Sequence, residues 1–80
     1  MLKRGANGGE VEELQQQLAQ LGYAVEVDGD FGATTEKAVK AFQSKAGLPA
    51  DGVVGPKTQA ALEEGARAAA DGMNAELLKE

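Results

Sequence analysis

Apolar residues recur at spacings of three and four in the first part of the chain. One stripe is formed by the apolar residues Val11, Leu14, Leu18 and Leu21. Glutamates and glutamines fill most positions between them, as in an amphipathic helix with one face toward a core. The sequence therefore predicts a helix here. Asn7 and Glu10 are expected to cap its start, and Gly22 to end it in a left-handed conformation.

The remaining pattern predicts two more helices. Residues 23–27 alternate between larger apolar residues and Ala or Glu, which favours a short extended segment rather than a full strand. A second helix is expected from near Ala33 to Gly47, and a third from Pro56, because proline is favoured at the first helical position. We expect the third helix to end at about Ala70, before the breaker Asp71-Gly72.

A twelve-residue segment occurs twice. Residues 28–39 read DGDFGATTEKAV and residues 51–62 read DGVVGPKTQAAL, so both fit D-G-x-apolar-G-x-x-T-x-x-A-apolar. The match extends backward, since Gln15 and Gly22 in the first helix correspond to Gln43 and Gly47 in the second. We therefore predict an all-α fold, a compact three-helix domain with an internal pseudo-twofold repeat and short extended loops between the helices.

Residues 1–62 are predicted to form the domain, and residues 63–80 to continue the third helix into a C-terminal tail or linker. The core is expected to contain fourteen apolar residues. They are Leu2, Val11, Leu14, Leu18, Leu21, Val27, Phe31, Ala38, Val39, Phe42, Leu48, Val54, Ala61 and Leu62.

The composition leaves few catalytic options. The 80 residues include no Cys and no His, which excludes thiolate or imidazole metal sites and Ser-His or Cys-His pairs. A carboxylate-dependent hydrolase would need a deep, dry pocket that a core of this size hardly encloses. We expect no catalytic residue, no metal and no cofactor.

The charge and hydropathy of the sequence limit the classes of partner that it can be expected to bind. The net charge is −5, and the Lys and Arg residues are scattered, so the sequence does not predict binding to nucleic acid or to an anionic membrane. No apolar run has the length of a signal peptide or of a membrane span. The absence of Cys fits a cytosolic protein and a cysteine-free exported module equally well.

The repeated motif residues have structural and functional interpretations. Asp28 and Asp51 are expected to bind backbone N–H groups two residues on; the spacing does not match an EF-hand. Thr35 and Thr58 are expected to help satisfy free N–H groups in the first helical turns. Gln15 and Gln43 could bond the opposite repeat's loop or a ligand's acetamido and peptide groups. Tyr23 could stack on a sugar or pack at the edge of the core.

Several motifs in order resemble one family. They are L-x-x-G at residues 2–5, V-x-x-L-Q-x-x-L-x-x-L-G-Y at 11–23, D-G-x-F-G-x-x-T-x-x-A-V-x-x-F-Q-x-x-x-G-L at 28–48 and D-G-x-V-G-x-x-T-x-x-A-L at 51–62. Together they resemble the peptidoglycan-binding domain 1 family over everything except the C-terminal tail. The resemblance implies a non-catalytic three-helix module that holds lytic enzymes such as endolysins on the cell wall. The family's domain is also similar to the prodomain of matrix metalloproteinases. The role of that prodomain requires a zinc-binding cysteine, which this chain lacks.

The resemblance implies peptidoglycan, through its glycan or its stem peptide, as the ligand. A covalently linked catalytic domain would be a partner, the chain a monomer, and the location the cell wall, the periplasm or the extracellular space. The alternative is an assembly module that docks a partner protein or a missing catalytic domain through an exposed stripe of Ala66, Ala69, Met73, Leu77 and Leu78. Because helix N-termini attract anions, we expect the ligand site beside the two repeated helix starts. The candidate residues are Arg4, Tyr23, Asp28, Gly29, Gly32, Thr35, Gln43, Asp51, Gly52, Gly55 and Thr58.

Overall fold

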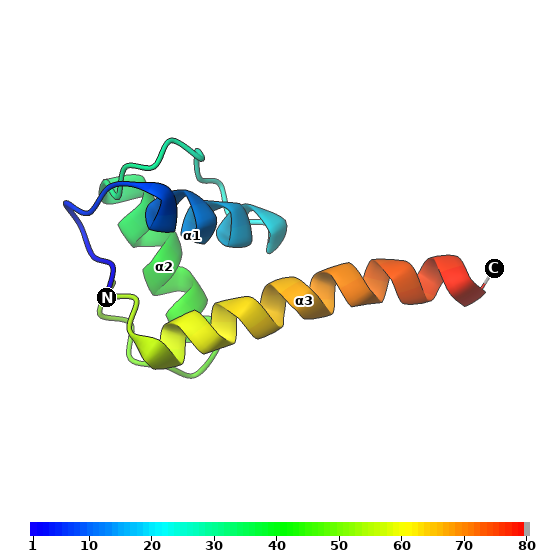
Figure 1. Ribbon diagram of the computed structural model, residues 1–80. Coiled ribbons are helices and arrows are strands. Elements are labelled where there is room, and N and C mark those ends of the chain that lie inside the picture. Colours follow the sequence, from blue (N-terminus) through cyan, green and yellow to red (C-terminus); the bar gives the residue numbers. More distant parts are fainter. Residues whose placement is uncertain (80) are drawn as a thin grey trace.

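Three helices make up the fold. The computed structural model describes the backbone of residues 1–79 and the side chains of residues 1–68. Helix α1 spans Gly9–Gln20, α2 spans Ala33–Lys45 and α3 spans Pro56–Lys79, and no strand occurs among these residues. Helix α1 packs against both α2 and α3 (Figure 1). The predicted three-helix fold is confirmed, as are the predicted starts of α2 and α3.

The core lies where the three helices meet. Its buried apolar residues are Val11, Leu14, Leu18, Phe31, Ala38, Val39, Phe42, Val54 and Leu62. All nine were predicted, whereas four further predicted residues, Leu2, Leu21, Leu48 and Ala61, are only partly buried. The prediction for Val27 was wrong, because its side chain is 45 % exposed. Residues 23–27 form no strand, so the alternation of core-facing and exposed side chains stops before Val27. Val25, in the same segment, packs against the core.

Glycine ends α1 and α2 as predicted. Gly22 has φ +94° and Gly47 has φ +76°, a conformation that costs glycine little. The N–H of Gly22 donates to the carbonyl of Ala19 at 3.0 Å, and the N–H of Tyr23 donates to that of Leu18 at 3.0 Å. This pair of bonds is a Schellman motif, and it satisfies carbonyls at the helix end that would otherwise lack partners.

The predicted cap of α1 was wrong. Gly8, with φ 119°, is the N-cap residue, and no side chain caps the helix. The backbone at Asn7 instead forms an isolated antiparallel bridge with Asp30. The N–H of Gly8 donates to the carbonyl of Gly29 at 2.9 Å, so pairing with the first turn decides the backbone in this segment.

The N-terminal segment joins both copies of the repeat. Leu2 and Val54 exchange two backbone hydrogen bonds, of 3.1 and 2.7 Å. Gly5 donates to the carbonyl of Phe31 at 3.0 Å, and Phe31 donates to that of Ala6 at 2.9 Å. The first eight residues therefore contact the second turn at one end and the first turn at the other.

Helix α3 is longer than the sequence predicted. It continues through Asp71-Gly72 to Lys79, so the expected end at Ala70 was wrong. A single glycine costs about 1 kcal/mol in a helix, and an alanine-rich sequence can tolerate that cost. In the expected exposed stripe, Ala66 is in fact buried. The side chains of Ala69, Met73, Leu77 and Leu78 lie outside the described residues, whereas the helix itself extends beyond α1 and α2 (Figure 1).

Candidate functional site

The side chain of Gln15 organises the first Asp-Gly turn. This residue is only 1 % exposed. Its Oε1 accepts the N–H groups of Asp28 at 3.0 Å and Gly29 at 2.9 Å. Its Nε2 donates to Asp28 Oδ1 and the Asp30 carbonyl, both at 3.0 Å, and to Thr35 Oγ1 at 3.1 Å. One amide from α1 thus holds the turn and the start of α2.

The side chain of Gln43 does the same for the second turn. It is also 1 % exposed. Its Oε1 accepts the N–H of Gly52 at 3.0 Å. Its Nε2 donates to Asp51 Oδ1 at 3.1 Å, to the Val53 carbonyl at 2.9 Å and to Thr58 Oγ1 at 3.1 Å. The two repeats therefore share a hydrogen-bond network as well as a sequence motif.

Both aspartates have the predicted structural role. Asp28 Oδ1 accepts the N–H of Asp30 at 3.0 Å, and Asp51 Oδ1 accepts that of Val53 at 3.0 Å. The N–H of Asp30 and then the Gln15 amide lower the pKa of Asp28 below its ordinary value. The N–H of Val53 and then the Gln43 amide lower the pKa of Asp51 in the same way. Both carboxylates are therefore ionised at neutral pH.

The buried polar side chains of the described part all belong to these networks. They are Gln15, Thr35, Gln43 and Thr58. The expectation that both threonines satisfy helix N–H groups was wrong. Their hydroxyl oxygens accept hydrogen bonds from the glutamine Nε2 groups instead, and α2 has no side-chain cap. Each glutamine bonds the turn that follows its own helix. A buried polar group is costly unless it is paired, so these four side chains stabilise the fold by being fully connected.

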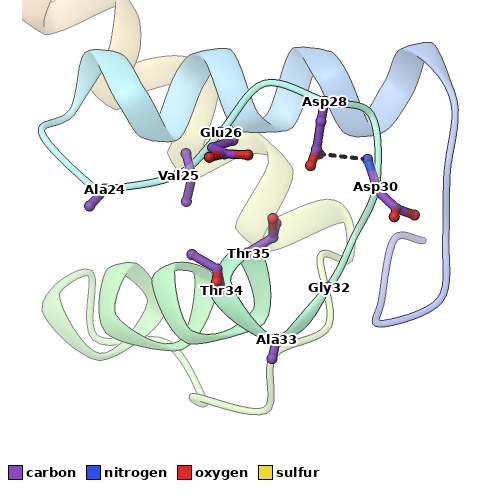
Figure 2. A pocket seen from close by; sticks show the side chains of 9 residues that line it. All are labelled: Ala24, Val25, Glu26, Asp28, Asp30, Gly32, Ala33, Thr34 and Thr35. Carbon is purple, nitrogen blue, oxygen red and sulfur yellow. Dashed lines mark hydrogen bonds between the residues drawn. The ribbon is translucent and has the colours of Figure 1, made fainter.

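An open groove, which we name groove A, lies between the first turn and the start of α2. It has a volume of about 580 Å³. Figure 2 shows Ala24, Val25 and Glu26 along one side and Thr34 and Thr35 of α2 facing them. Its lining residues are Ala24, Val25, Glu26, Asp28, Asp30, Gly32, Ala33, Thr34 and Thr35. Three carboxylates and no cation line groove A.

A smaller hollow adjoins groove A. We name it the Tyr23 hollow; it has a volume of about 350 Å³ and is lined by Tyr23, Ala24, Thr34, Lys37, Ala38 and Ala41. It shares Ala24 and Thr34 with groove A, so the two form one elongated surface along α2. The Tyr23 ring is half-buried and packs edge-on against Phe42, with ring centroids 6.3 Å apart. Tyr23 is thus both an edge of the core and a wall of the surface.

The second repeat has its own groove, which we name groove B. Its volume is about 380 Å³. It is lined by Met1, Gln43, Leu48, Pro49, Asp51, Val53, Gly55, Pro56, Lys57 and Thr58. Eight of these residues follow groove A residues by 23 positions in the sequence. Grooves A and B therefore occupy matching places in the two repeats.

The structure brings most of the predicted site residues to the two grooves. Gly29 and Gly52 are buried in the turns and line neither groove. Arg4 also lies apart, with its guanidinium 3.8 Å from a carboxylate oxygen of Glu36. Sequence reasoning missed Ala24, Glu26 and Thr34. Their position beside the repeated motif was the available signal, but periodicity could not show which way residues 24–26 face.

The sequence of this chain is similar to the sequences of known proteins. Residues 7–62 match the family model described as "Putative peptidoglycan binding domain". The chain belongs to this family. It is 43% identical over 65 residues to the N-acetylmuramoyl-L-alanine amidase CwlL of Bacillus licheniformis, covering 78% of the chain and 18% of the amidase. It is 48% identical over 63 residues to a spore cortex-lytic enzyme of Bacillus cereus, covering 78% and 24%.

The fold of this chain is also similar to that of a solved structure. The crystal structure of the SleB N-terminal domain superposes with a TM-score of 0.79 at 45% identity, covering 81% of this chain and 90% of that one. The chain spans only about a fifth of the length of the curated relatives, 18% of the amidase and 24% of the cortex-lytic enzyme. The similarity to these enzymes is therefore a similarity to one domain of each.

Proposed function

We propose that this chain is a non-catalytic module that binds peptidoglycan in the cell wall and anchors a lytic enzyme there. Membership of the peptidoglycan-binding family supports the ligand. The observation that supports the site is groove A with the adjoining Tyr23 hollow, an elongated open surface in which the buried Gln15 amide bonds the lining residues Asp28 and Thr35. Such a surface suits a polymer that lies along it rather than a small molecule that is enclosed.

The groups along this surface match the polar groups of peptidoglycan. The carboxylates of Glu26 and Asp30 would accept hydrogen bonds from sugar hydroxyls, amide N–H groups or an ammonium group. Only one oxygen of Asp28 is used by the hydrogen bonds found in the described part, so the other could accept a ligand donor. The half-buried ring of Tyr23 would pack against a sugar face.

Binding at so open a surface would be weak, with a Kd of about 10 µM to 1 mM. Attachment to an enzyme would make this affinity useful, because a tether turns the second contact with the polymer into an intramolecular step. Many weak contacts also allow release and rebinding along an insoluble substrate.

The side chains of the site give no support to catalysis by this chain. Within residues 1–68 no group of three or more His, Cys, Asp or Glu residues could hold a metal ion. Asp28 and Asp51 have lowered pKa values, so neither suits a general acid at neutral pH. No helix in the described part is long and apolar enough to cross a membrane.

Co-sedimentation with insoluble peptidoglycan tests this function. The purified chain should sediment with the polymer and release no soluble muropeptide. Thr34→Trp would place a large ring at the junction of groove A and the Tyr23 hollow, and it should reduce the bound fraction several-fold. Ser44→Trp is the matched control, because Ser44 is exposed on the same helix and lines neither groove. Equal sedimentation of this chain and an unrelated acidic protein of the same size would contradict the proposal.

A further inference from the structure

Grooves A and B are built on the same frame. Asp51, Gly55 and Thr58 of groove B match Asp28, Gly32 and Thr35 of groove A. A buried glutamine amide bonds the aspartate and the threonine in each case, at distances of 3.0 to 3.1 Å. The two grooves therefore share one backbone arrangement and differ in some of the residues that line them.

The linings of the two grooves differ in charge and polarity. Val53 of groove B stands where groove A has Asp30, and Lys57 stands where groove A has Thr34. Pro49 stands where groove A has Glu26, so it forms an apolar wall with Leu48 in groove B, whereas Glu26 is the third carboxylate of groove A. Among the side chains, groove A thus combines three carboxylates with no cation, and groove B combines the Asp51 carboxylate with the Lys57 ammonium group and an apolar wall.

The cation of groove B has no partner among the described side chains. The ion pair found within residues 1–68 joins Arg4 to Glu36, and Lys57 forms no ion pair with another described side chain. The carboxylate of Asp51 is bonded through Oδ1 to the Gln43 amide and the Val53 N–H, which orients it within the turn. Lys57 is therefore the group in groove B that is placed to meet an anionic ligand.

We propose that groove B is a second ligand site, which takes a carboxylate-terminated peptide end with small apolar side chains, such as an alanyl-alanine terminus. Lys57 would pair with the terminal carboxylate, while Leu48, Pro49 and Val53 would contact the methyl groups. The volume of about 380 Å³ suits a dipeptide rather than a longer segment. This inference rests on the proposed function, because it names the part of peptidoglycan, a stem-peptide end, that the second repeat reads.

The test is an amide chemical-shift titration of the full chain with N-acetyl-D-alanyl-D-alanine and with its C-terminal amide. The free acid should shift amides of residues 48–58, with a Kd of the order of millimolar. The neutral amide should bind about two- to fivefold more weakly, which is the size expected for an exposed ion pair. Raising the ionic strength should weaken only the acid.

Substitution of the lysine identifies the partner of the carboxylate. Lys57→Met keeps an unbranched side chain as far as Cε and removes the charged Nζ. It should therefore weaken binding of the acid two- to fivefold and leave binding of the neutral amide unchanged. Lys45→Met, at the exposed end of α2 and outside both grooves, is the matched control. Equal affinity for acid and amide, equal loss with both variants, or shifts confined to groove A would each overturn the inference.

Co-sedimentation separates this inference from the proposed function. If the chain sediments with peptidoglycan but the acid shifts no amide in residues 48–58, the inference fails and the proposed function stands. If the acid binds groove B through Lys57 but the chain does not sediment, the proposed function fails and groove B remains a site for carboxylate-terminated peptides.

Discussion

The amide nitrogen of Gln15 lies 3.1 Å from the hydroxyl oxygen of Thr35, so a buried side chain of α1 bonds the first turn of α2. Gln43 and Thr58 repeat this relationship at the same distance. Each pair lies under an Asp-Gly turn and beside a groove. The stability of the domain and the shape of its surface therefore depend on the same two glutamines.

Replacing Gln15 with leucine should destabilise the fold. The substitution leaves the N–H groups of Asp28 and Gly29 and the hydroxyl of Thr35 without the partner they now have. Each unsatisfied buried group costs about 1–3 kcal/mol, so we expect a loss of at least 3 kcal/mol in the free energy of unfolding. Urea denaturation measures it. Gln16→Leu, at an exposed position, is the control, and equal effects of the two substitutions would refute the role of Gln15.

Acid should weaken the domain through Asp28 and Asp51. Their pKa values are lowered in the folded state from an ordinary value of 3.8. The stability they contribute is therefore fully present well above pH 3.8 and is lost as the pH falls through the folded-state pKa. Thermal unfolding followed from pH 7 down to pH 2 measures this loss.

Asp28→Asn should flatten part of that pH profile. An asparagine oxygen can still accept the N–H of Asp30, but it no longer titrates. Asp30→Asn is the control, because no hydrogen bond to the Asp30 carboxylate is found among the described residues. A profile for Asp28→Asn with the same acid slope as the parent chain would show that Asp28 does not contribute.

Gly29 should not tolerate a side chain. It has φ +75°, and an added Cβ would lie 3.2 Å from the Glu12 side chain and 3.4 Å from the Gly8 carbonyl oxygen. We expect Gly29→Ala to cost about 1–2 kcal/mol, which is the cost of a left-handed conformation in a non-glycine residue. Gly32→Ala should be nearly neutral, because a Cβ there meets nothing within 4 Å and φ is −100°. A chemical denaturation midpoint that falls equally for both would contradict this explanation.

Phe31 should be essential for folding. It is among the largest fully buried side chains, and its backbone pairs with the N-terminal segment. Phe31→Ala should lower the free energy of unfolding by about 3–5 kcal/mol, enough to unfold much of a domain of this size. Val27→Ala, at the exposed position, should change it by less than about 0.5 kcal/mol. Circular dichroism during thermal unfolding would reveal a wrong assignment if both variants melted alike.

Helix spacing and the repeat predicted the fold well. The starts of α2 and α3, the glycine ends of α1 and α2, and the nine buried core residues all followed from apolar periodicity and turn chemistry. One error arose where pairing distant in the sequence decides the backbone. The bridge between Asn7 and Asp30 replaces the expected cap. Val27 leaves the core because the extended segment forms no strand.

The candidate site was predictable only in part. The repeat marked both turns and both helix starts, and these contribute residues to grooves A and B. It could not show that the Gln15 and Gln43 amides face inward, because a glutamine beside an apolar residue can face the core or the solvent. Nor could it place Glu26 and Thr34 on opposite sides of one groove, since that depends on how residues 23–27 cross α2.

Chemical-shift mapping with soluble muropeptides tests the central claim most directly. We predict that amides within residues 23–35, the segment that supplies the whole lining of groove A and part of the Tyr23 hollow, shift on titration. Thr34→Trp should suppress these shifts, and Ser44→Trp should leave them intact. Unperturbed amides in residues 23–35 at muropeptide concentrations of several millimolar, or shifts that Thr34→Trp does not change, would contradict the account.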